Sequence, residues 1–226
     1  MTELRAKRPL KNGRRNRRSQ IGRLPPASDK AAETYNRLVE SAGILLGEVG
    51  FERLSSNAIC DRAELTPPTF YRYFNNKYEI LEVLAEHLLT RSMDAFDIWL
   101  SSDGIWDAKA DNTALLEQWF RISSEIVASE PGGIWTMRAM RALPQLSHLR
   151  LQSQRQMTKQ MFVVARKLRP ELNEDLLYNR LRVAAEFGYA VDELILEEDR
   201  ISSRALIKQA AFLFNAFLAA ILRNPD

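Results

Sequence analysis

The sequence predicts an all-α protein of about nine helices, and three observations support this fold class. Apolar residues recur at intervals of three and four along most of the 226 residues, which is the period of an amphipathic helix. Glycine and proline are few, at nine of each, and no segment shows the strict alternation of a half-buried strand. The chain is also long enough for a small domain followed by a larger one.

Composition narrows the cellular setting. No uninterrupted run of eighteen apolar residues occurs, and the N-terminus carries charge without an apolar segment or a cleavage site. We therefore expect no membrane-spanning or exported segment and a cytoplasmic protein. The single cysteine, Cys60, excludes an intramolecular disulfide framework and is expected to be a small buried side chain.

Positive charge is concentrated at one end of the chain. Residues 1–28 hold nine basic residues against the one acidic residue Glu3, so the formal charge of +3 divides into +8 for this segment and −5 for the rest. Residues 1–27 have almost no periodic apolar residues and are predicted to be a disordered basic arm. Such an arm either is a solvated tail or follows a DNA backbone and minor groove.

Residues 28–75 predict a domain of three helices. The first helix begins after a cap at Ser28 or Asp29 and is closed by Gly50. A second spans about residues 55–63, and Thr66 caps a short third helix opened by one of two consecutive prolines. Either Asn75 or Asn76 caps a long fourth helix, to about residue 100, which begins the remainder of the chain, residues 76–226.

The third helix is expected to have two different faces. Phe70 and Phe74 are four residues apart and should point into the domain. Tyr71, Arg72 and Tyr73 should point outward, where hydroxyl, guanidinium and aromatic groups suit phosphates and base edges.

Together these segments resemble the DNA-binding domain of the TetR family of helix-turn-helix transcriptional regulators. The resemblance covers roughly residues 29–90 and is carried by Gly50, Phe51, Ile59, Cys60, Ala63, Leu65, Thr66, Thr69, Phe70, Tyr71, Tyr73, Phe74, Lys77 and Leu81. It implies that two copies of the third helix enter successive major grooves of a palindromic operator in double-stranded DNA. Thr66, Thr69 and Lys77 would hold phosphates, while Tyr71, Arg72 and Tyr73 would reach the backbone or bases. The predicted DNA-binding residues are Thr66, Pro68, Thr69, Tyr71, Arg72, Tyr73 and Lys77.

The sequence departs from the family pattern at two places. Glu64 occupies the corner where the family usually has glycine, so it must either take a left-handed conformation, at about 1–2 kcal/mol, or use a different turn. Pro67 and Pro68 remove two backbone donors that could otherwise meet a phosphate, which makes the hydroxyl of Thr66 more important.

Beyond residue 101, caps and breakers predict helices at about residues 113–129, 134–142, 144–168, 174–198 and 203–223. Aromatic and methionine side chains gather in the middle of this region. They either form ordinary core or line a cavity for an apolar or aromatic small-molecule effector. The candidate pocket residues are Trp99, Trp119, Phe120, Trp135, Met140 and Met161, and the candidate polar anchors are Glu125, Arg138, Arg141 and His148.

The last two predicted helices have apolar sectors wider than one packing face needs. In the last of them the apolar residues run from Leu206 to Leu222 and include five alanines. A second apolar face needs a second partner, so we expect these two helices to form a four-helix bundle with a symmetry mate and make a homodimer.

Catalytic, metal and cofactor signatures are absent from the sequence. It has two histidines and one cysteine, and it lacks a glycine-rich phosphate loop, a paired metal-ligand spacing and a nucleophile elbow. We therefore predict no enzyme and no cofactor, but a homodimeric DNA-binding regulator, most simply a ligand-released repressor. The alternatives are an architectural DNA-binding protein without sequence specificity, which would explain the basic arm, and a small-molecule-binding helical protein or enzyme, which would explain the aromatic middle section.

Overall fold

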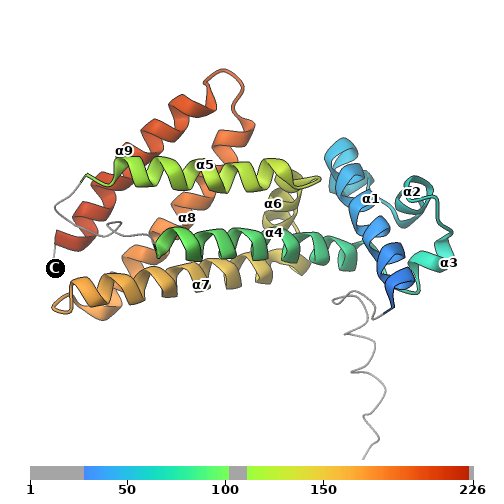
Figure 1. The fold of residues 1–226 in the computed structure, drawn as a ribbon, viewed down its shortest axis with the longest axis horizontal. Helices are drawn as coiled ribbons and strands as arrows, with labels where there is room; N and C mark the ends of the chain where they lie inside the picture. The colour runs from blue at the N-terminus through green and yellow to red at the C-terminus, as the bar shows by residue number, and fades with distance from the viewer. Residues whose placement is uncertain (1–27, 102–110, 224–226) are drawn as a thin grey trace, which may run out of the picture.

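A computed structural model describes residues 28–101 and 111–223, and all of the nine elements in this part of the chain are helices (Figure 1). The all-α prediction is confirmed. The predicted basic arm of residues 1–27 lies outside the described residues. Apolar side chains of the described residues form two buried clusters, one where the first helices meet the body and one inside the body.

The N-terminal domain consists of α1 (Asp29–Arg53), α2 (Ser56–Arg62) and α3 (Pro67–Phe70). Ser28 is the N-cap of α1, and Gly50 breaks its regular helix with φ 72° and ψ 172°, as expected for a closing glycine. Local signals also set the short α3, where Thr66 is the N-cap and prolines fill the first two positions.

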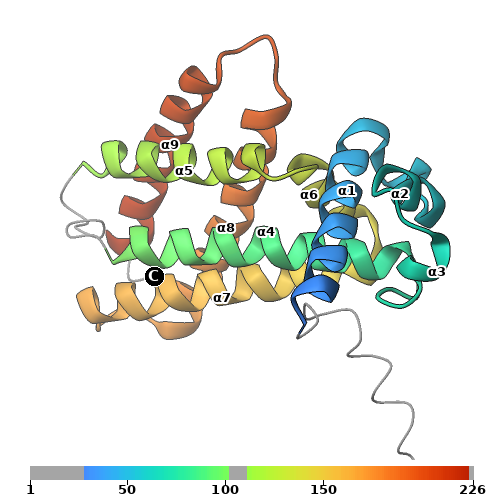
Figure 2. The same ribbon diagram turned by 45° about the vertical axis from the view of Figure 1, so that its right-hand side comes forward.

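The body contains α4 (Lys77–Leu100), α5 (Thr113–Ser129), α6 (Gly133–Ala142), α7 (Pro144–Leu168), α8 (Glu174–Glu197) and α9 (Ser203–Arg223). Asn76 caps α4 because its side-chain oxygen accepts from the backbone N–H groups of Tyr78 and Glu79, at 2.9 and 3.3 Å. Helices α4 and α7 run side by side, α5 packs on α4 and α9, and α6 contacts α1 (Figures 1 and 2).

A glycine contact joins the N-terminal domain to the body. Gly132, in the turn between α5 and α6, has a φ of 69°, and a Cβ on it would lie 2.4 Å from the carbonyl oxygen of Gly43 in α1. A Cβ on Gly43 would in turn lie 2.7 Å from the carbonyl oxygen of Pro131. Two backbones can approach this closely only without side chains, so the turn fixes the position of α1 against α6.

Among the described helices, Ser203–Leu222 in α9 is long and apolar enough to cross a membrane by length and composition alone, which the absence of an unbroken apolar run did not anticipate. Only 28% of this window is buried in the single chain. One side of α9 packs on α5 and α8, so the remaining apolar face needs an occupant.

Candidate DNA-binding surface and effector cavity

The turn between α2 and α3 adopts one of the two conformations expected for it. Glu64 has a φ of 52°, which is left-handed, and it is the only described non-glycine residue with positive φ. The backbone N–H of Leu65 donates to the carbonyl of Cys60 at 2.9 Å, and a guanidinium nitrogen of Arg37 donates to the carbonyl of Ala63 at 2.5 Å. These bonds satisfy the end of α2 and hold the corner in place.

The aromatic residues of α3 and of the turn that follows it divide largely as predicted. Phe70 and Phe74 are buried, with their ring centroids 5.4 Å apart, and Phe74 stacks on Tyr35 of α1 at 5.3 Å. Tyr71 is 55% exposed and Arg72 is also exposed. Within the described residues the guanidinium of Arg72 makes no hydrogen bond or ion pair, so its donors are available to a ligand.

Tyr73 does not point fully outward as predicted. It is half-buried, and its ring meets that of Tyr35 edge to face with the centroids 6.1 Å apart. The short α3 ends at Phe70, and the following turn brings Tyr73 back against α1. Its remaining accessible edge can still contact a backbone.

The hydroxyl groups near α3 interact with one another. The Oγ1 atoms of Thr66 and Thr69 lie 3.1 Å apart, and the hydroxyls of Ser56 and Tyr71 are at the same separation. Thr66 and Pro68 are exposed, and Thr69 is half-exposed. The Thr66 side chain does not cap the backbone of α3, so its hydroxyl remains near the surface. Thr66, Pro68, Thr69, Tyr71 and Arg72 are therefore all accessible in α3 or directly beside it.

Lys77 has a role that differs from the predicted phosphate contact. Its ammonium donates to the carbonyl oxygens of Phe51 and Leu54, both at 3.0 Å, and to that of Glu52 at 3.4 Å. These carbonyls follow the break at Gly50, where the helix leaves acceptors without intrahelical partners. All three ammonium donors are thus directed at the protein, and Lys77 ties the start of α4 to the end of α1.

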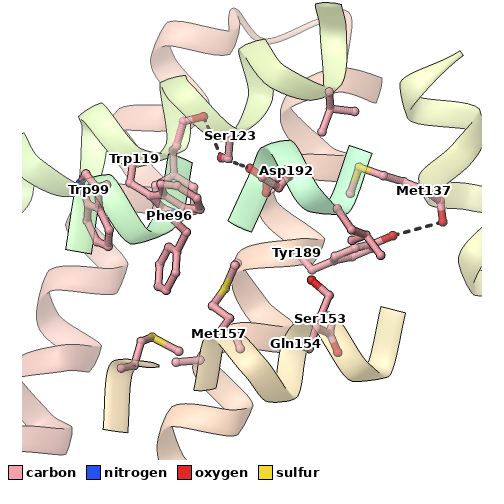
Figure 3. Close-up of a pocket in the computed structure, with 18 of the residues that line it drawn as sticks. Phe96, Trp99, Trp119, Ser123, Met137, Ser153, Gln154, Met157, Tyr189 and Asp192 are labelled. Atoms are coloured by element: carbon pink, nitrogen blue, oxygen red, sulfur yellow. Dashed lines mark hydrogen bonds between the residues drawn. The ribbon is translucent and has the colours of Figure 1, made fainter. Parts of the chain in front are cut away.

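The body contains a cavity of about 100 Å³ bounded by α4 to α9. Of the predicted pocket residues, Trp99, Trp119, Phe120, Met140 and Met161 line it. Figure 3 shows Phe96, Trp99 and Trp119 grouped at one end, with the Phe96 and Trp119 ring centroids 4.9 Å apart. The indole N–H of Trp99 donates to the carbonyl of Leu115 at 3.0 Å, so this end of the cavity offers aromatic surface.

Trp135 was wrongly predicted to line the pocket. Its ring lies against Gly50, where an added Cβ would be 3.1 Å from it, and the guanidinium of Arg138 stacks over it at 4.7 Å. Trp135 is therefore part of the contact between α1 and α6, and it does not line the cavity.

None of the predicted polar anchors lines the cavity either. Arg138 pairs with Glu197 at 2.8 Å and Arg141 with Glu193 at 3.0 Å, while Glu125 and His148 are exposed. The polar lining residues, which the sequence did not single out, are Ser92, Ser123, Arg150, Ser153, Gln154, Tyr189 and Asp192.

Asp192 is the acidic group of the cavity (Figure 3). It accepts a hydrogen bond from the hydroxyl of Ser123 at 2.6 Å. Burial raises the pKa of Asp192 to about 7, although the Ser123 bond opposes the shift. Tyr189 on the same helix donates from its hydroxyl to the carbonyl of Met137 at 3.2 Å, and burial raises the pKa of its phenol as well.

Comparison with known proteins agrees with this architecture. Residues 38–84 match the model of the family described as bacterial regulatory proteins, tetR family. An uncharacterized HTH-type transcriptional regulator, YvdT of Bacillus subtilis, is 30% identical over 88 residues, which cover 37% of this chain and 45% of that protein. The chain spans about half the length of the curated relatives it matches.

Solved structures of similar fold extend over most of the chain. A tetR-family regulator from Streptomyces coelicolor has a TM-score of 0.60 at 19% identity, covering 83% of this chain and 82% of its own. The fatty acid degradation regulator FadR from Bacillus halodurans has a TM-score of 0.62 at 17% identity, with 84% and 97% covered. Residues 38–84 are therefore similar to the helix-turn-helix domain of tetR-family regulators, and the fold over most of the chain is similar to theirs. Among the described residues no group of three His, Cys, Asp or Glu side chains could hold a metal ion.

Proposed function

We propose that this protein is a sequence-specific DNA-binding transcriptional regulator that acts as a homodimer in the cytoplasm. The observation that carries the proposal is the exposed surface of α3, presented by a helix-turn-helix whose own aromatic residues, Phe70 and Phe74, are buried. Arg72 offers the two-pronged donor that favours guanine, and Tyr71 is exposed beside it. Thr66, Pro68, Thr69 and the accessible edge of Tyr73 complete the surface that faces the DNA.

We infer from the charge distribution that residues 1–27 contribute a large part of the affinity for DNA. Residues 28–75 carry five basic against seven acidic side chains, so the helix-turn-helix domain itself has a formal charge of −2. The nine basic residues before it supply the positive charge that attracts phosphates. Deleting residues 1–27 should therefore lower the affinity for DNA and flatten its dependence on salt; an unchanged slope would rule out phosphate contacts by this segment.

The homodimer is supported by apolar side chains that are exposed in the described part of the single chain. On α8, Val183, Phe187 and Leu194 are each about half exposed, at 47%, 53% and 47%, and exposed Ala190 lies on the same stripe. On α9, Phe212 and Leu213 are 62% and 63% exposed, and the exposed Ala216 and Ala220 continue that face. Spacings of three and four give each helix one continuous stripe, as a four-helix bundle requires.

A matched pair of substitutions tests the dimer. Val183→Glu places a charge in the proposed interface, whereas Val163→Glu places the same charge at a similarly exposed site, 53%, on α7. Sedimentation should show monomers for the first variant at concentrations where the second remains dimeric. Dimers in both variants would contradict the assignment, and detergent-dependent solubility of the unaltered chain would favour membrane association of α9.

Ligand release is the simplest regulatory mechanism for the cavity. A molecule bound among α4 to α9 can shift DNA affinity only if it binds two conformations of the dimer differently. Residues of α4 line the cavity. The first residue of the same helix, Lys77, donates a hydrogen bond to the carbonyl of Phe51 at the end of α1. We infer repression relieved by an effector, because displacement of α4 would change the spacing of the two α3 helices from the groove repeat of about 34 Å.

Selection of bound fragments from genomic DNA followed by footprinting tests the main proposal. A discrete palindromic site is expected, and its position relative to genes would distinguish repression from activation. Arg72→Ala should weaken binding to that site by about tenfold or more, whereas Arg155→Ala, an exposed arginine on α7, should not. Uniform protection without a preferred sequence would refute the proposal and favour an architectural DNA-binding protein.

A further inference from the structure

Two side chains that line the cavity each have a buried donor with no partner among the described residues. Gln154 of α7 is only 4% exposed. Its side-chain oxygen accepts from Arg182 at 2.8 Å and from Arg150 at 3.3 Å, while its Nε2 atom makes no hydrogen bond. The Nε atom of Arg150 is buried and unpaired as well. Both residues line the cavity, and buried N–H groups without acceptors are costly in a folded protein.

The side chains around these donors carry an excess positive charge. Glu186 accepts from Arg150 at 3.0 Å and from Arg182 at 3.3 Å. Arg141 pairs with Glu193 at 3.0 Å and lies 4.0 Å from Glu186. Three guanidinium groups thus share two carboxylates in this cluster, and Asp192, which accepts from Ser123 instead, is the other carboxylate near the cavity.

The remaining walls favour an apolar ligand body. Phe96, Trp99 and Trp119 present their rings at 4.9 to 5.7 Å from one another, and Trp99 has already used its N–H on a carbonyl. Among the described residues that line the cavity, Asp192 is the only acidic one. Burial raises the pKa of this carboxyl to about 7, so near neutral pH a substantial fraction is protonated and repulsion of an anion is reduced.

We propose that the effector is an aromatic organic acid whose carboxylate accepts hydrogen bonds from Gln154 and Arg150 and whose apolar body packs on Phe96, Trp99 and Trp119. The proposal rests on the regulatory function inferred above and specifies the chemical class of its ligand. A neutral amide of the same shape would lose the charge attraction, and an amine would meet unpaired donors in place of acceptors.

Calorimetric titration of the full chain with an acid, an amide and an amine of equal apolar size tests the proposal. Naphthylacetate should bind, naphthylacetamide about tenfold more weakly, and naphthylethylamine more weakly still. Tightest binding by the amine would overturn the proposal and assign the cavity to cations through Asp192. Failure of naphthylacetate and of a second, smaller acid, phenylbutyrate, to bind at millimolar concentration would overturn it as well.

Substitutions then locate the contact. Gln154→Glu preserves the oxygen that Arg182 and Arg150 contact but replaces the unpaired N–H₂ with a second oxygen, so it should weaken naphthylacetate binding about tenfold or more. Gln156→Glu makes the same change at an exposed position of α7 and should have no effect. Arg150→Lys, which retains the charge beside Glu186 but lacks Nε, should weaken binding too. Asp192→Asn, which removes a carboxylate from the lining, should strengthen it. Equal affinities in all four variants, with thermal unfolding showing them folded, would refute the assignment.

Operator binding without ligand separates this inference from the proposed function. A chain that binds a discrete DNA site but no acid would refute the ligand class and leave the regulator intact. A chain that binds naphthylacetate but shows no sequence preference on DNA would refute the regulator and retain the acid site.

Discussion

Gly43 and Gly47 lie one turn apart on α1, and replacing each with alanine should change stability in opposite directions. At Gly47, an added Cβ would meet Gly132 at 3.6 Å, an ordinary contact. At Gly43, the Cβ would lie 2.7 Å from the carbonyl oxygen of Pro131 and 3.0 Å from its Cβ. The first distance is too short for backbone atoms to accommodate without moving the turn between α5 and α6.

The magnitudes follow from two opposing contributions. Alanine in place of glycine inside a helix contributes about 0.5–1 kcal/mol, and Gly47→Ala should gain that amount. The same gain applies to Gly43→Ala, but forcing atoms into a packed contact costs about 1–3 kcal/mol. The turn is also fixed on its other side, where a Cβ on Gly132 would meet Gly43 at 2.4 Å. We therefore expect a net loss of about 1–2 kcal/mol for Gly43→Ala.

Thermal unfolding of the two variants and the parent chain measures this difference. For a chain of this length about 1 kcal/mol corresponds to a shift of about 2–4 °C, so the two midpoints should differ by several degrees. Gly43→Ala unfolding at or above the midpoint of Gly47→Ala would show that the turn does not bear on α1 as closely as the structure indicates.

Three further predictions concern other parts of the molecule. Lys77→Met should lower stability by about 1–2 kcal/mol, because carbonyls at the end of α1 lose their donor. It should leave the salt dependence of DNA binding unchanged. A decrease of about one in the slope of log binding constant against log salt concentration would instead show that Lys77 contacts a phosphate. Asp192→Asn should be more stable than the parent by about 1–4 kcal/mol at about pH 8 and equally stable below about pH 4. The reason is that the pKa of Asp192 is about 7 in the folded protein against an ordinary value of 3.8, so the parent loses stability as the pH rises from the lower value to the higher one. Urea unfolding at several pH values measures this difference. A free energy of unfolding of the parent that does not fall between about pH 4 and about pH 8 would contradict the burial of the carboxyl. Trp135→Ala should cost about 2 kcal/mol of stability without changing naphthylacetate affinity in calorimetry, because its ring lies outside the cavity; weaker binding would return Trp135 to the pocket.

Local chemistry explains why the helix boundaries were predictable. Gly50, Pro67 and Asn76 each impose a backbone conformation or a cap that depends on immediate neighbours. Glu64 shows the limit of such reasoning, because the sequence left two turn conformations open. The structure selects the left-handed one, which the Arg37 bond to the carbonyl of Ala63 supports from another helix.

The errors concern the destination of long side chains. Periodicity placed Trp135 on an apolar face of its helix, but the cavity and the contact with α1 both require apolar residues, so the pattern could not distinguish them. The same ambiguity applies to Lys77. Its place in the sequence agrees with a phosphate contact, yet its long side chain reaches carbonyls at the end of α1 that lie more than twenty residues earlier in the sequence. The buried amide of Gln154 carried no signal, because a lone glutamine in a polar helix is usually solvated.

One helix connects the two sites that these residues define. Helix α4 has 24 residues, and at about 1.5 Å per residue it extends about 36 Å. At its start Lys77 is bonded to the end of α1, and near its end Phe96 and Trp99 form the aromatic wall of the cavity. The glycine contact between α1 and the turn before α6 provides a second connection. An effector that displaces the aromatic wall therefore cannot move α4 freely, because both connections resist rotation of the N-terminal domain. Under the proposed function, the free energy of coupling between effector and operator is then set by how these two contacts differ between the DNA-bound and released conformations. The effector must lower the affinity for the operator by the same factor by which the operator lowers the affinity for the effector.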